Sequence, residues 1–361
     1  MVNNNKPFNL MDGATGETTA IVREVDQQWR ISANPELPLD QRLEAYEDIF
    51  DSEVGDTSLV RARNIEREVG FRQIYLKFEG GNPTGTQKDR IAFAQAMDAL
   101  RRGFDTINVA TCGNYGVAIA LAARFAGLRN RIYIPENYHT RRIQEMTDLG
   151  AEIIRVQGDY EKAVEESSED ARKQDLYDAN PGGDNMLMQM RAYGQIAYEI
   201  YDELRDAPAA VSVPVSNGTT LAGIYRGFLS LYRRGKTSRM PRMVAGSSFR
   251  KNPIVHAFLN NKPSCEDLSP GKIHETSINE PLVNWHSIDG DYALDAIRQT
   301  GGWAADVSDK AMRNAYRLIR EKEGLQVLPA STASMIALME KHLKEPLTND
   351  RYVVVLTGRK S

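Results

Sequence analysis

The sequence of 361 residues is long enough for two compact domains, and its 41% hydrophobic and 26% charged residues are typical of a globular protein. The formal net charge of -4 gives no electrostatic reason to expect nucleic acid or an anionic membrane as a partner. With two cysteines, no apolar signal segment at the start and no apolar run of membrane-spanning length, we expect a cytoplasmic protein without a disulfide framework.

The first half of the chain changes character near residue 72. Residues 1–55 are polar, and short helices are expected around 27–29 and 39–50. Strands and helices then alternate. We expect strands at 74–78, 106–110, 131–134 and 151–156, and helices from the turn after residue 85 to 102, at 115–126, ending at 149, and at 159–174.

The same alternation returns in the second half. We expect helices at 191–205, 221–234, 308–323 and 332–343, strands at 210–215, 243–245 and 352–356, and an extended segment at 325–328. The stretch 250–305 is rich in Pro, Asn, Asp and Gly and is expected to form loops with short elements. Alternating strands and helices favour parallel sheets covered by helices on both faces.

Several common kinds of site are excluded by their missing motifs. No glycine is followed by another glycine two positions later, so the dinucleotide fingerprint is absent, and so is the P-loop. There is no C-x-x-C or H-E-x-x-H motif and the five histidines are scattered, so we expect no metal site. The G-x-S-x-G motif of serine hydrolases is absent as well.

One lysine stands at a position where ligands bind in α/β proteins. Lys88 follows the glycine-rich turn after strand 74–78 and begins a helix. The positive end of the helix dipole and any burial both lower the pKa of a lysine, and the neutral amine is the form that makes a Schiff base. The alternative is an exposed lysine in the first turn of a helix.

Three other strand-to-helix turns carry small polar residues. Residues 215–221 read V-S-N-G-T-T-L, which fits either a phosphate cradle of backbone amides or an ordinary helix cap. Residues 111–116 read T-C-G-N-Y-G, which also suits a purely structural turn. Near the end, Thr357 follows the buried strand 352–356.

These segments, in this order, resemble the fold-type II enzymes that use pyridoxal 5'-phosphate (PLP), and threonine synthase most of all. The lysine motif of threonine synthase reads N-P-T-G-S-F-K-D-R, and residues 82–90 here read N-P-T-G-T-Q-K-D-R. Residues 55–60, G-D-T-S-L-V, look like the G-x-T-P-L segment of the family. The resemblance runs from about residue 55 to the C-terminus.

The resemblance assigns a role to each turn. Lys88 would hold PLP as a Schiff base and act as the catalytic acid and base, and Asn114 would bind the 3'-oxygen of PLP. Thr357 would face the pyridine nitrogen, where a hydroxyl leaves that nitrogen largely unprotonated. The cofactor phosphate would be bound by Ser216, Asn217, Gly218, Thr219 and Thr220, and the substrate by Thr111, Cys112, Gly113, Tyr115 and Gln195.

The resemblance also implies an architecture. The fold class is α/β, with two open, mostly parallel sheet domains and PLP in the cleft between them. The large PLP-binding domain would combine residues 1–92 and 181–361, and residues 93–180 would form a small mobile domain. A homodimer is usual for the group.

The substrate implied is a small amino acid, and the first hypothesis is the conversion of O-phosphohomoserine to threonine and phosphate. Residues 178–181 and 193–195 resemble the N-P-x-R-x-x-G-Q run of threonine synthase, but the arginine beside Pro181 is missing. Arg191, and Arg141 or Arg142, are candidate replacements for phosphate-binding residues. Gln87 and Tyr115 are further departures from the family pattern.

Two alternatives remain open. One is β-elimination or β-replacement on a serine derivative such as O-phosphoserine or O-acetylserine, of the cysteine synthase, cysteate synthase or serine/threonine dehydratase type. The other is a PLP-binding regulator without turnover.

Overall fold

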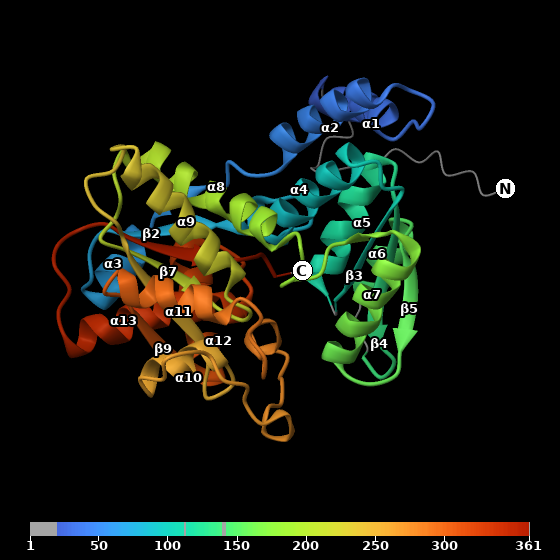
Figure 1. The fold of residues 1–361 in the computed structure, drawn as a ribbon. Coiled ribbons are helices and arrows are strands. Elements are labelled where there is room, and N and C mark those ends of the chain that lie inside the picture. The colour runs from blue at the N-terminus through green and yellow to red at the C-terminus, as the bar shows by residue number, and fades with distance from the viewer. Residues whose placement is uncertain (1–19, 112, 139–141, 361) are drawn as a thin grey trace. The chain divides into compact units, whose positions relative to one another are not determined.

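The computed structural model describes residues 20–111, 113–138 and 142–360 (Figure 1). The chain divides into two compact units. Unit 1 holds the described residues of Met1–Val54 and Lys88–Asn185, and unit 2 holds those of Gly55–Gln87 and Met186–Ser361. The α/β class with two mainly parallel sheets, predicted from the alternation of strands and helices, is confirmed.

Unit 1 is built on a four-stranded parallel sheet with the order β5-β4-β3-β6. Its central strand β3 is buried along its whole length, as expected for a parallel strand covered on both faces. The strands are β3 (Thr106–Ala110), β4 (Arg129–Pro135), β5 (Glu152–Val156) and β6 (Tyr177–Asp178). The helices are α1 (Ala20–Ser32), α2 (Leu39–Glu53), α4 (Lys88–Arg101), α5 (Asn114–Ala126), α6 (Arg142–Asp148) and α7 (Tyr160–Gln174).

The two N-terminal helices belong to unit 1, which differs from the expected division into 1–92 plus 181–361 and 93–180. The indole of Trp29 in α1 donates to Arg124 O at 3.1 Å, and the buried hydroxyl of Tyr46 in α2 lies 3.3 Å from Phe93 O. Helices α1 and α2 are polar apart from single residues such as Trp29 and Tyr46, so their sequence does not indicate which helices they pack against.

Unit 2 is built on a six-stranded sheet with the order β1-β2-β10-β7-β8-β9. The edge strand β1 is antiparallel to β2, and the other neighbours are parallel. The strands are β1 (Leu59–Arg61), β2 (Ile74–Phe78), β7 (Ala210–Pro214), β8 (Arg242–Ser248), β9 (Trp303–Val307) and β10 (Tyr352–Leu356). The helices are α3 (Arg63–Val69), α8 (Met186–Leu204), α9 (Thr219–Arg233), α10 (Pro253–Leu259), α11 (Gly290–Gln299), α12 (Asp309–Glu323) and α13 (Ala333–Lys344).

The helices of unit 2 approach one another and the sheet closely. Helices α8 and α9 lie side by side (Figure 1), and a Cβ atom on Gly227 of α9 would stand 2.5 Å from Gly194 O of α8. A Cβ atom on Gly246 of β8 would stand 2.1 Å from Ala333 O, so glycine lets α13 pack directly on the strand. Among the helices of the described residues, none combines the length and the apolar character needed to cross a bilayer.

The stretch 250–305 contains more regular structure than the sequence predicts. Helices α10 and α11 and the edge strand β9 lie here. Strand β9 reads W-A-A-D-V and is only partly buried, so it lacks the apolar run of an inner strand. Helix α11 buries Ala293, Leu294, Ala296 and Ile297, a helical spacing that the surrounding loop residues obscure.

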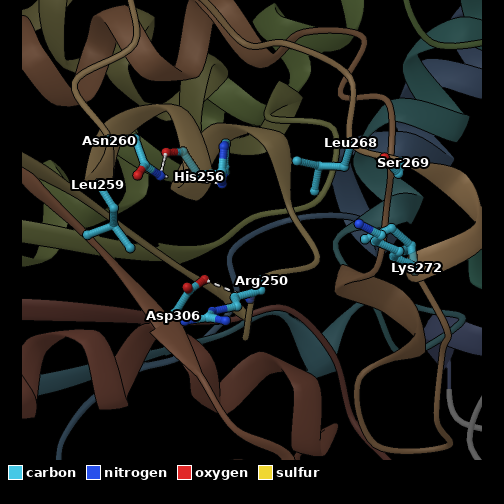
Figure 2. A pocket seen from close by; sticks show the side chains of 9 residues that line it. Arg250, His256, Leu259, Asn260, Leu268, Ser269, Lys272 and Asp306 are labelled. Atoms are coloured by element: carbon cyan, nitrogen blue, oxygen red, sulfur yellow. Dashed lines mark hydrogen bonds between the residues drawn. The ribbon is translucent and has the colours of Figure 1, made fainter.

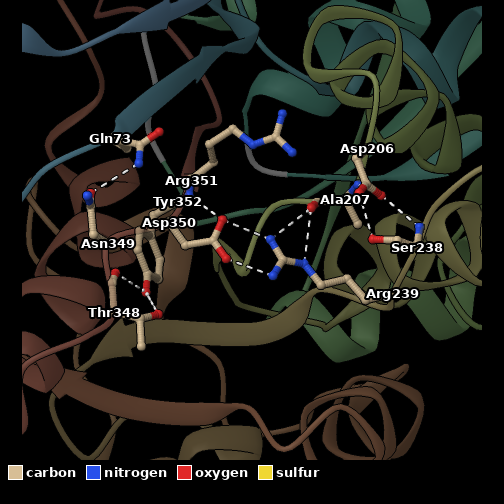
Figure 3. A network of polar contacts seen from close by, with 10 residues as sticks. All are labelled: Gln73, Asp206, Ala207, Ser238, Arg239, Thr348, Asn349, Asp350, Arg351 and Tyr352. Carbon is tan, nitrogen blue, oxygen red and sulfur yellow. Dashed lines mark hydrogen bonds and ion pairs between the residues drawn. The ribbon is translucent and has the colours of Figure 1, made fainter.

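At the amino ends of strands β7, β8 and β10, polar side chains join the connecting loops (Figure 3). The guanidinium of Arg239 forms a two-point contact with the Asp350 carboxylate at 2.7 and 2.8 Å and also donates to Ala207 O. Asp206 accepts the backbone N–H of Ser238 at 2.8 Å. The hydrogen bond from Arg239 is the largest cause of the lowered pKa of Asp350.

We expect Asp350→Asn to lower the free energy of unfolding at pH 7 by about 0.5–1 kcal/mol, allowing for solvent screening of the partly exposed Arg239. Because the folded-state pKa of Asp350 is lowered, its contribution is present above the ordinary carboxyl pKa and is lost as the pH falls through the lowered value. Urea unfolding at pH 7 and near pH 3 measures both effects. The control is Asp202→Asn on the exposed face of α8. The stabilising role of the Asp350–Arg239 pair would be contradicted if Asp350→Asn lowered the free energy of unfolding equally at both pH values, or if the control lowered it as much.

Candidate active site

The turn that precedes Lys88 is fastened to the end of strand β10. The N–H of Gln87 donates to Thr357 O at 3.0 Å, and the N–H of Arg359 donates to Gly85 O at 2.8 Å. Gly85 has a φ of +87°, and a Cβ atom there would lie 2.6 Å from Arg359 Nε. Lys88 follows Gln87 directly as the first residue of α4.

A buried polar network holds the same turn from the other side. The Asn82 side chain accepts the N–H of Gly55 at 3.0 Å and donates to Glu79 O at 2.9 Å. The hydroxyl of Thr57 donates to Glu79 Oε1 at 2.7 Å. Glu79 and Asn82 are at most 1% exposed. The G-x-T segment at residues 55–57 and the lysine motif, which the sequence suggested separately, therefore touch.

An ion pair lies behind this network. Lys77 Nζ is 2.5 Å from Glu199 Oε2 on α8 and also donates to Thr57 O. The side chain of Lys77 is 1% exposed, and that of Glu199 is 14% exposed. A buried charge is tolerated only when it is paired and hydrogen-bonded, and both conditions are met for Lys77.

In unit 1, the turn between β3 and α5 is supported by the segment that follows β6. Thr111 N–H donates to Tyr133 O at 3.1 Å, and Gly113 N–H lies 3.4 Å from Thr111 Oγ1. Asn180, which is 1% exposed, accepts the N–H of Ala110 at 2.8 Å. Asn114 begins α5 and is partly exposed. The predicted substrate residue Cys112 lies outside the described residues, as does Arg141.

Tyr115 is brought to Lys88. The Lys88 Nζ atom lies over its ring, 5.3 Å from the centroid. The Tyr115 hydroxyl donates to Ala179 O at 2.9 Å and accepts from the Gln95 side chain, and the residue is 5% exposed. Tyr115 was predicted to bind substrate, and its observed contacts tie it to Lys88 and to residue 179 instead of leaving its hydroxyl to a ligand.

The loop after β7 has the backbone of an anion cradle. Gly218 has a φ of +95° and is the N-cap of α9, so no N-cap side chain occupies the first amides of the helix. Ser216 O accepts from Asn252 Nδ2 at 2.9 Å and from Ser287 Oγ at 3.0 Å, and Asn217 O accepts the N–H of Asp289 at 3.0 Å. Because N–H and C=O of one peptide unit point in opposite directions, the amides of the next residues face away from these partners. The loop therefore fits the phosphate group of PLP.

The residues that hold this loop were missed by sequence reasoning. Asn252, Asn284, Ser287 and Asp289 lie in the stretch taken for loops. Asn284 donates to Asn217 Oδ1 at 2.5 Å, and the Thr219 hydroxyl donates to Asp289 Oδ2 at 2.5 Å. Asp289 is fully buried, which only the structure shows, so the sequence offered no local signal of its contact with the loop. Thr220, also predicted at this loop, is partly exposed in the first turn of α9.

Helices α8 and α6 carry the remaining residues that the sequence singled out. Gln195 and Arg191 are exposed, whereas Tyr193 and Gly194 between them are buried, with Gly194 against Gly223 and Gly227 of α9. Arg142 begins α6 and pairs with Glu145 at 3.0 Å on the same helix. The glycine at position 194 is thus accounted for by the close packing of α8 on α9.

The sequence matches the family model described as pyridoxal-phosphate dependent enzyme over residues 50–358. The chain belongs to this family. The enzyme class and the cofactor predicted from the lysine motif are thereby confirmed. The residues that the resemblance assigns to PLP include Lys88 and Asn114 in unit 1 and the 216–220 loop in unit 2, and the backbone of that loop fits a phosphate group.

Threonine synthases are among the similar sequences. The threonine synthase of Methanocaldococcus jannaschii is 32% identical over 310 residues, which cover 84% of this chain and 74% of that protein. The threonine synthase of Mycobacterium tuberculosis is 30% identical over 290 residues, covering 79% of this chain and 76% of that protein. The likeness to threonine synthase predicted from the sequence is confirmed.

Similar solved structures include other PLP enzymes of the same fold type. Maize serine racemase has a TM-score of 0.72 at 17% identity and covers 88% of this chain and 93% of its own. The processed form of threonine deaminase isoform 2 from Solanum lycopersicum has a TM-score of 0.71 at 16% identity, covering 91% and 92%. At this identity the likeness concerns the fold alone.

We expect Lys77→Met to lower the free energy of unfolding by about 3 kcal/mol, because it leaves the partly buried Glu199 without its partner. The double variant Lys77→Met/Glu199→Leu should lose less free energy of unfolding than the single variant, because it removes both charges and leaves neither unpaired. Urea unfolding measures the cycle, with the exposed Lys236→Met as the control. Equal losses in the single and double variants would contradict this account of the ion pair.

Proposed function

We propose that the protein is a PLP-dependent lyase that converts O-phosphohomoserine to threonine and phosphate. The observation that carries this proposal is the motif at residues 82–90, whose turn is locked onto Thr357 so that Lys88 follows it at the start of α4. The threonine synthases at about 30% identity over most of the chain support the same reaction. The reaction breaks the bond between Cγ and the phosphate oxygen and releases phosphate, Cβ loses a proton while Cγ gains one and becomes a methyl group, and water adds its hydroxyl to Cβ and a proton to Cα.

The chain supplies binding and proton transfer in this proposal. PLP, when bound, supplies an electron sink that makes the Cα–H of an amino acid acidic. Lys88 carries the cofactor and, once substrate has displaced its amine, removes and returns the proton at Cα. Asn114 donates a hydrogen bond to the 3'-oxygen, and the hydroxyl of Thr357 faces the ring nitrogen. The loop 216–220 binds the cofactor phosphate through its amides.

The substrate carboxylate is assigned to the β3–α5 turn. Thr111, Gly113 and Asn114 offer amides and a hydroxyl at the start of α5, where the positive end of the helix dipole favours an anion, and Cys112 lies among them in the sequence. Gln195, which the resemblance also assigns to the substrate, is exposed on α8, whereas Tyr193 and Gly194 beside it are buried.

A second candidate is favoured by the altered phosphate-contact positions. Arg191 is exposed on α8, and Arg142 pairs with Glu145 on its own helix. The missing arginine beside Pro181 favours β-elimination or β-replacement on a serine derivative without a phosphate, such as O-acetylserine, for which the leaving group stands one carbon closer to Cα.

We also propose that the protein works as a homodimer in the cytoplasm, as the family resemblance suggests. Light scattering of the PLP-loaded protein should give twice the mass of one chain, and the mass of a single chain would reject the dimer.

We expect Lys88→Ala to abolish both the yellow absorbance of the purified protein and the covalent adduct that borohydride traps. The methyl side chain of alanine offers no amine to the aldehyde of PLP. Mass spectrometry of the reduced protein locates the adduct, and Lys236→Ala, which changes an exposed lysine, is the control. An adduct that survives in Lys88→Ala would reject the assignment of this lysine.

With O-phosphohomoserine we expect release of phosphate and formation of threonine in equal amounts. A parallel panel of O-phosphoserine, O-acetylserine, serine and threonine tests the second candidate, for which we expect keto-acid release or consumption of added sulfide or sulfite. Amino-acid analysis and a phosphate assay measure the outcome. Turnover of the serine derivatives alone would replace the first reaction by the second, and spectral changes without turnover would favour a regulator.

A further inference from the structure

Unit 2 contains a pocket of about 530 Å³ beside the carboxyl ends of β8 and β9 (Figure 2). Its walls come from three places in the sequence. Arg250 follows strand β8, and Asp306 lies near the end of strand β9. His256 and Leu259 belong to α10, and Lys272 lies in the segment of residues 268–273. A volume between about 300 and 1,000 Å³ is typical of sites for small molecules. The residues assigned to PLP and its substrate above do not line it.

The charges of the pocket favour an anion. Arg250 and Lys272 bring two cations, and Asp306 brings one carboxylate. That carboxylate already accepts the N–H of Arg250 at 3.2 Å, and burial raises its pKa. Figure 2 shows Lys272 and Leu268 across the pocket from Leu259. Leu259 and Leu268 thus give the pocket apolar groups on two sides, and with Ile273, which also lines it, they suit a ligand with an apolar body.

The backbone at Arg250 is held in a conformation that non-glycine residues rarely adopt. Its φ is +56°, in the left-handed region, and its N–H is used by Asp306. Such strain persists only where surrounding contacts impose it, and it gathers at functional sites. Here it keeps the guanidinium-bearing residue at the rim of the pocket, where Arg250 lies beside Asp306 (Figure 2).

The same segment is joined to the 216–220 loop. Asn252, two residues after Arg250, donates to Ser216 O and caps α10 by accepting from Ile254 and Val255. Lys251 O accepts the N–H of Asn284, whose side chain donates to Asn217. A displacement of residues 250–252 therefore reaches both Ser216 and Asn217 through hydrogen bonds.

We propose that this pocket binds a small organic anion with an aliphatic body, held between Arg250 and Lys272, and that its binding changes the affinity of the 216–220 loop for the phosphate of PLP. The site itself stands apart from the proposed function, and the coupling rests on the binding of PLP by that loop. Thermodynamic linkage requires the effect to be mutual, so PLP also changes the affinity of the pocket for its anion.

The binding test uses the full-length protein as purified and 3-methylbutyrate, with 3-methylbutylamine as a probe of the same body and opposite charge. Saturation-transfer NMR should show saturable binding of the carboxylate and not of the amine. We expect Lys272→Gln to weaken binding about tenfold, the loss of one charge-assisted hydrogen bond. Arg250→Gly should do the same without strain, because glycine adopts a φ of +56° freely.

Two further variants complete the binding test. Ser269→Glu, in the exposed loop at the rim, should also weaken binding by repelling the carboxylate. The exposed Lys236→Gln should bind as wild type does. Absence of binding, or binding that Lys272→Gln and Arg250→Gly leave unchanged, overturns the site.

The coupling is measured as the rate of PLP release, followed by absorbance, with and without saturating 3-methylbutyrate. We expect a change of about fivefold in wild type, which is a typical allosteric coupling, and none in Lys272→Gln. The same release rate with and without the anion in wild type overturns the coupling. If the protein held no PLP at all, the proposed function would fail while the binding comparison would still decide the pocket.

Discussion

The position of Lys88 depends on one short piece of backbone pairing. Strands β2 and β10 are parallel neighbours, so both end at the same edge of the sheet. The turn that leaves β2 returns to that edge, where Gln87 bonds to Thr357 and Gly85 bonds to Arg359. Gln87, the residue before Lys88, is thereby fixed to Thr357 by a main-chain hydrogen bond, and the turn depends on glycine at position 85, where φ is positive.

Buried polar and charged side chains hold the turn in place. Glu79, Lys77 and Asn82 have almost no exposure, and each would be unfavourable in an apolar interior without its partners. Together they satisfy one another and the Gly55–Thr57 segment. Because a partly satisfied network is worse than an apolar core, the arrangement admits one geometry, and that single geometry is what a covalently bound cofactor requires of its lysine.

The sequence was sufficient where the signal is local. Short stretches of sequence are enough to predict the turn at residues 80–85, the apolar strand 352–356 and the polar turn after β7. It was insufficient where the partner is distant. Asn252, Asn284, Ser287 and Asp289 hold the 216–220 loop from 32 or more residues away along the chain, as the contacts of Ser247 with Val215 also do. Tyr46 and Trp29 anchor α1 and α2 to unit 1 in the same way. Such long-range contacts produce no hydrophobic periodicity in the sequence from which they could be predicted.

The fold does not choose the reaction, since a serine racemase and a threonine deaminase share it with TM-scores of 0.72 and 0.71. The reaction is decided by a few side chains of the site. The ring of Tyr115 packs beside the Lys88 amine while its hydroxyl bonds to Ala179, next to Asn180, whose side chain bonds to Ala110. The segment 178–181, where the chain departs from the threonine synthase pattern, is therefore joined by hydrogen bonds both to Tyr115 and to the strand that leads into the β3–α5 turn. A change in that segment would reach Tyr115, the residue beside the lysine, through one hydrogen bond.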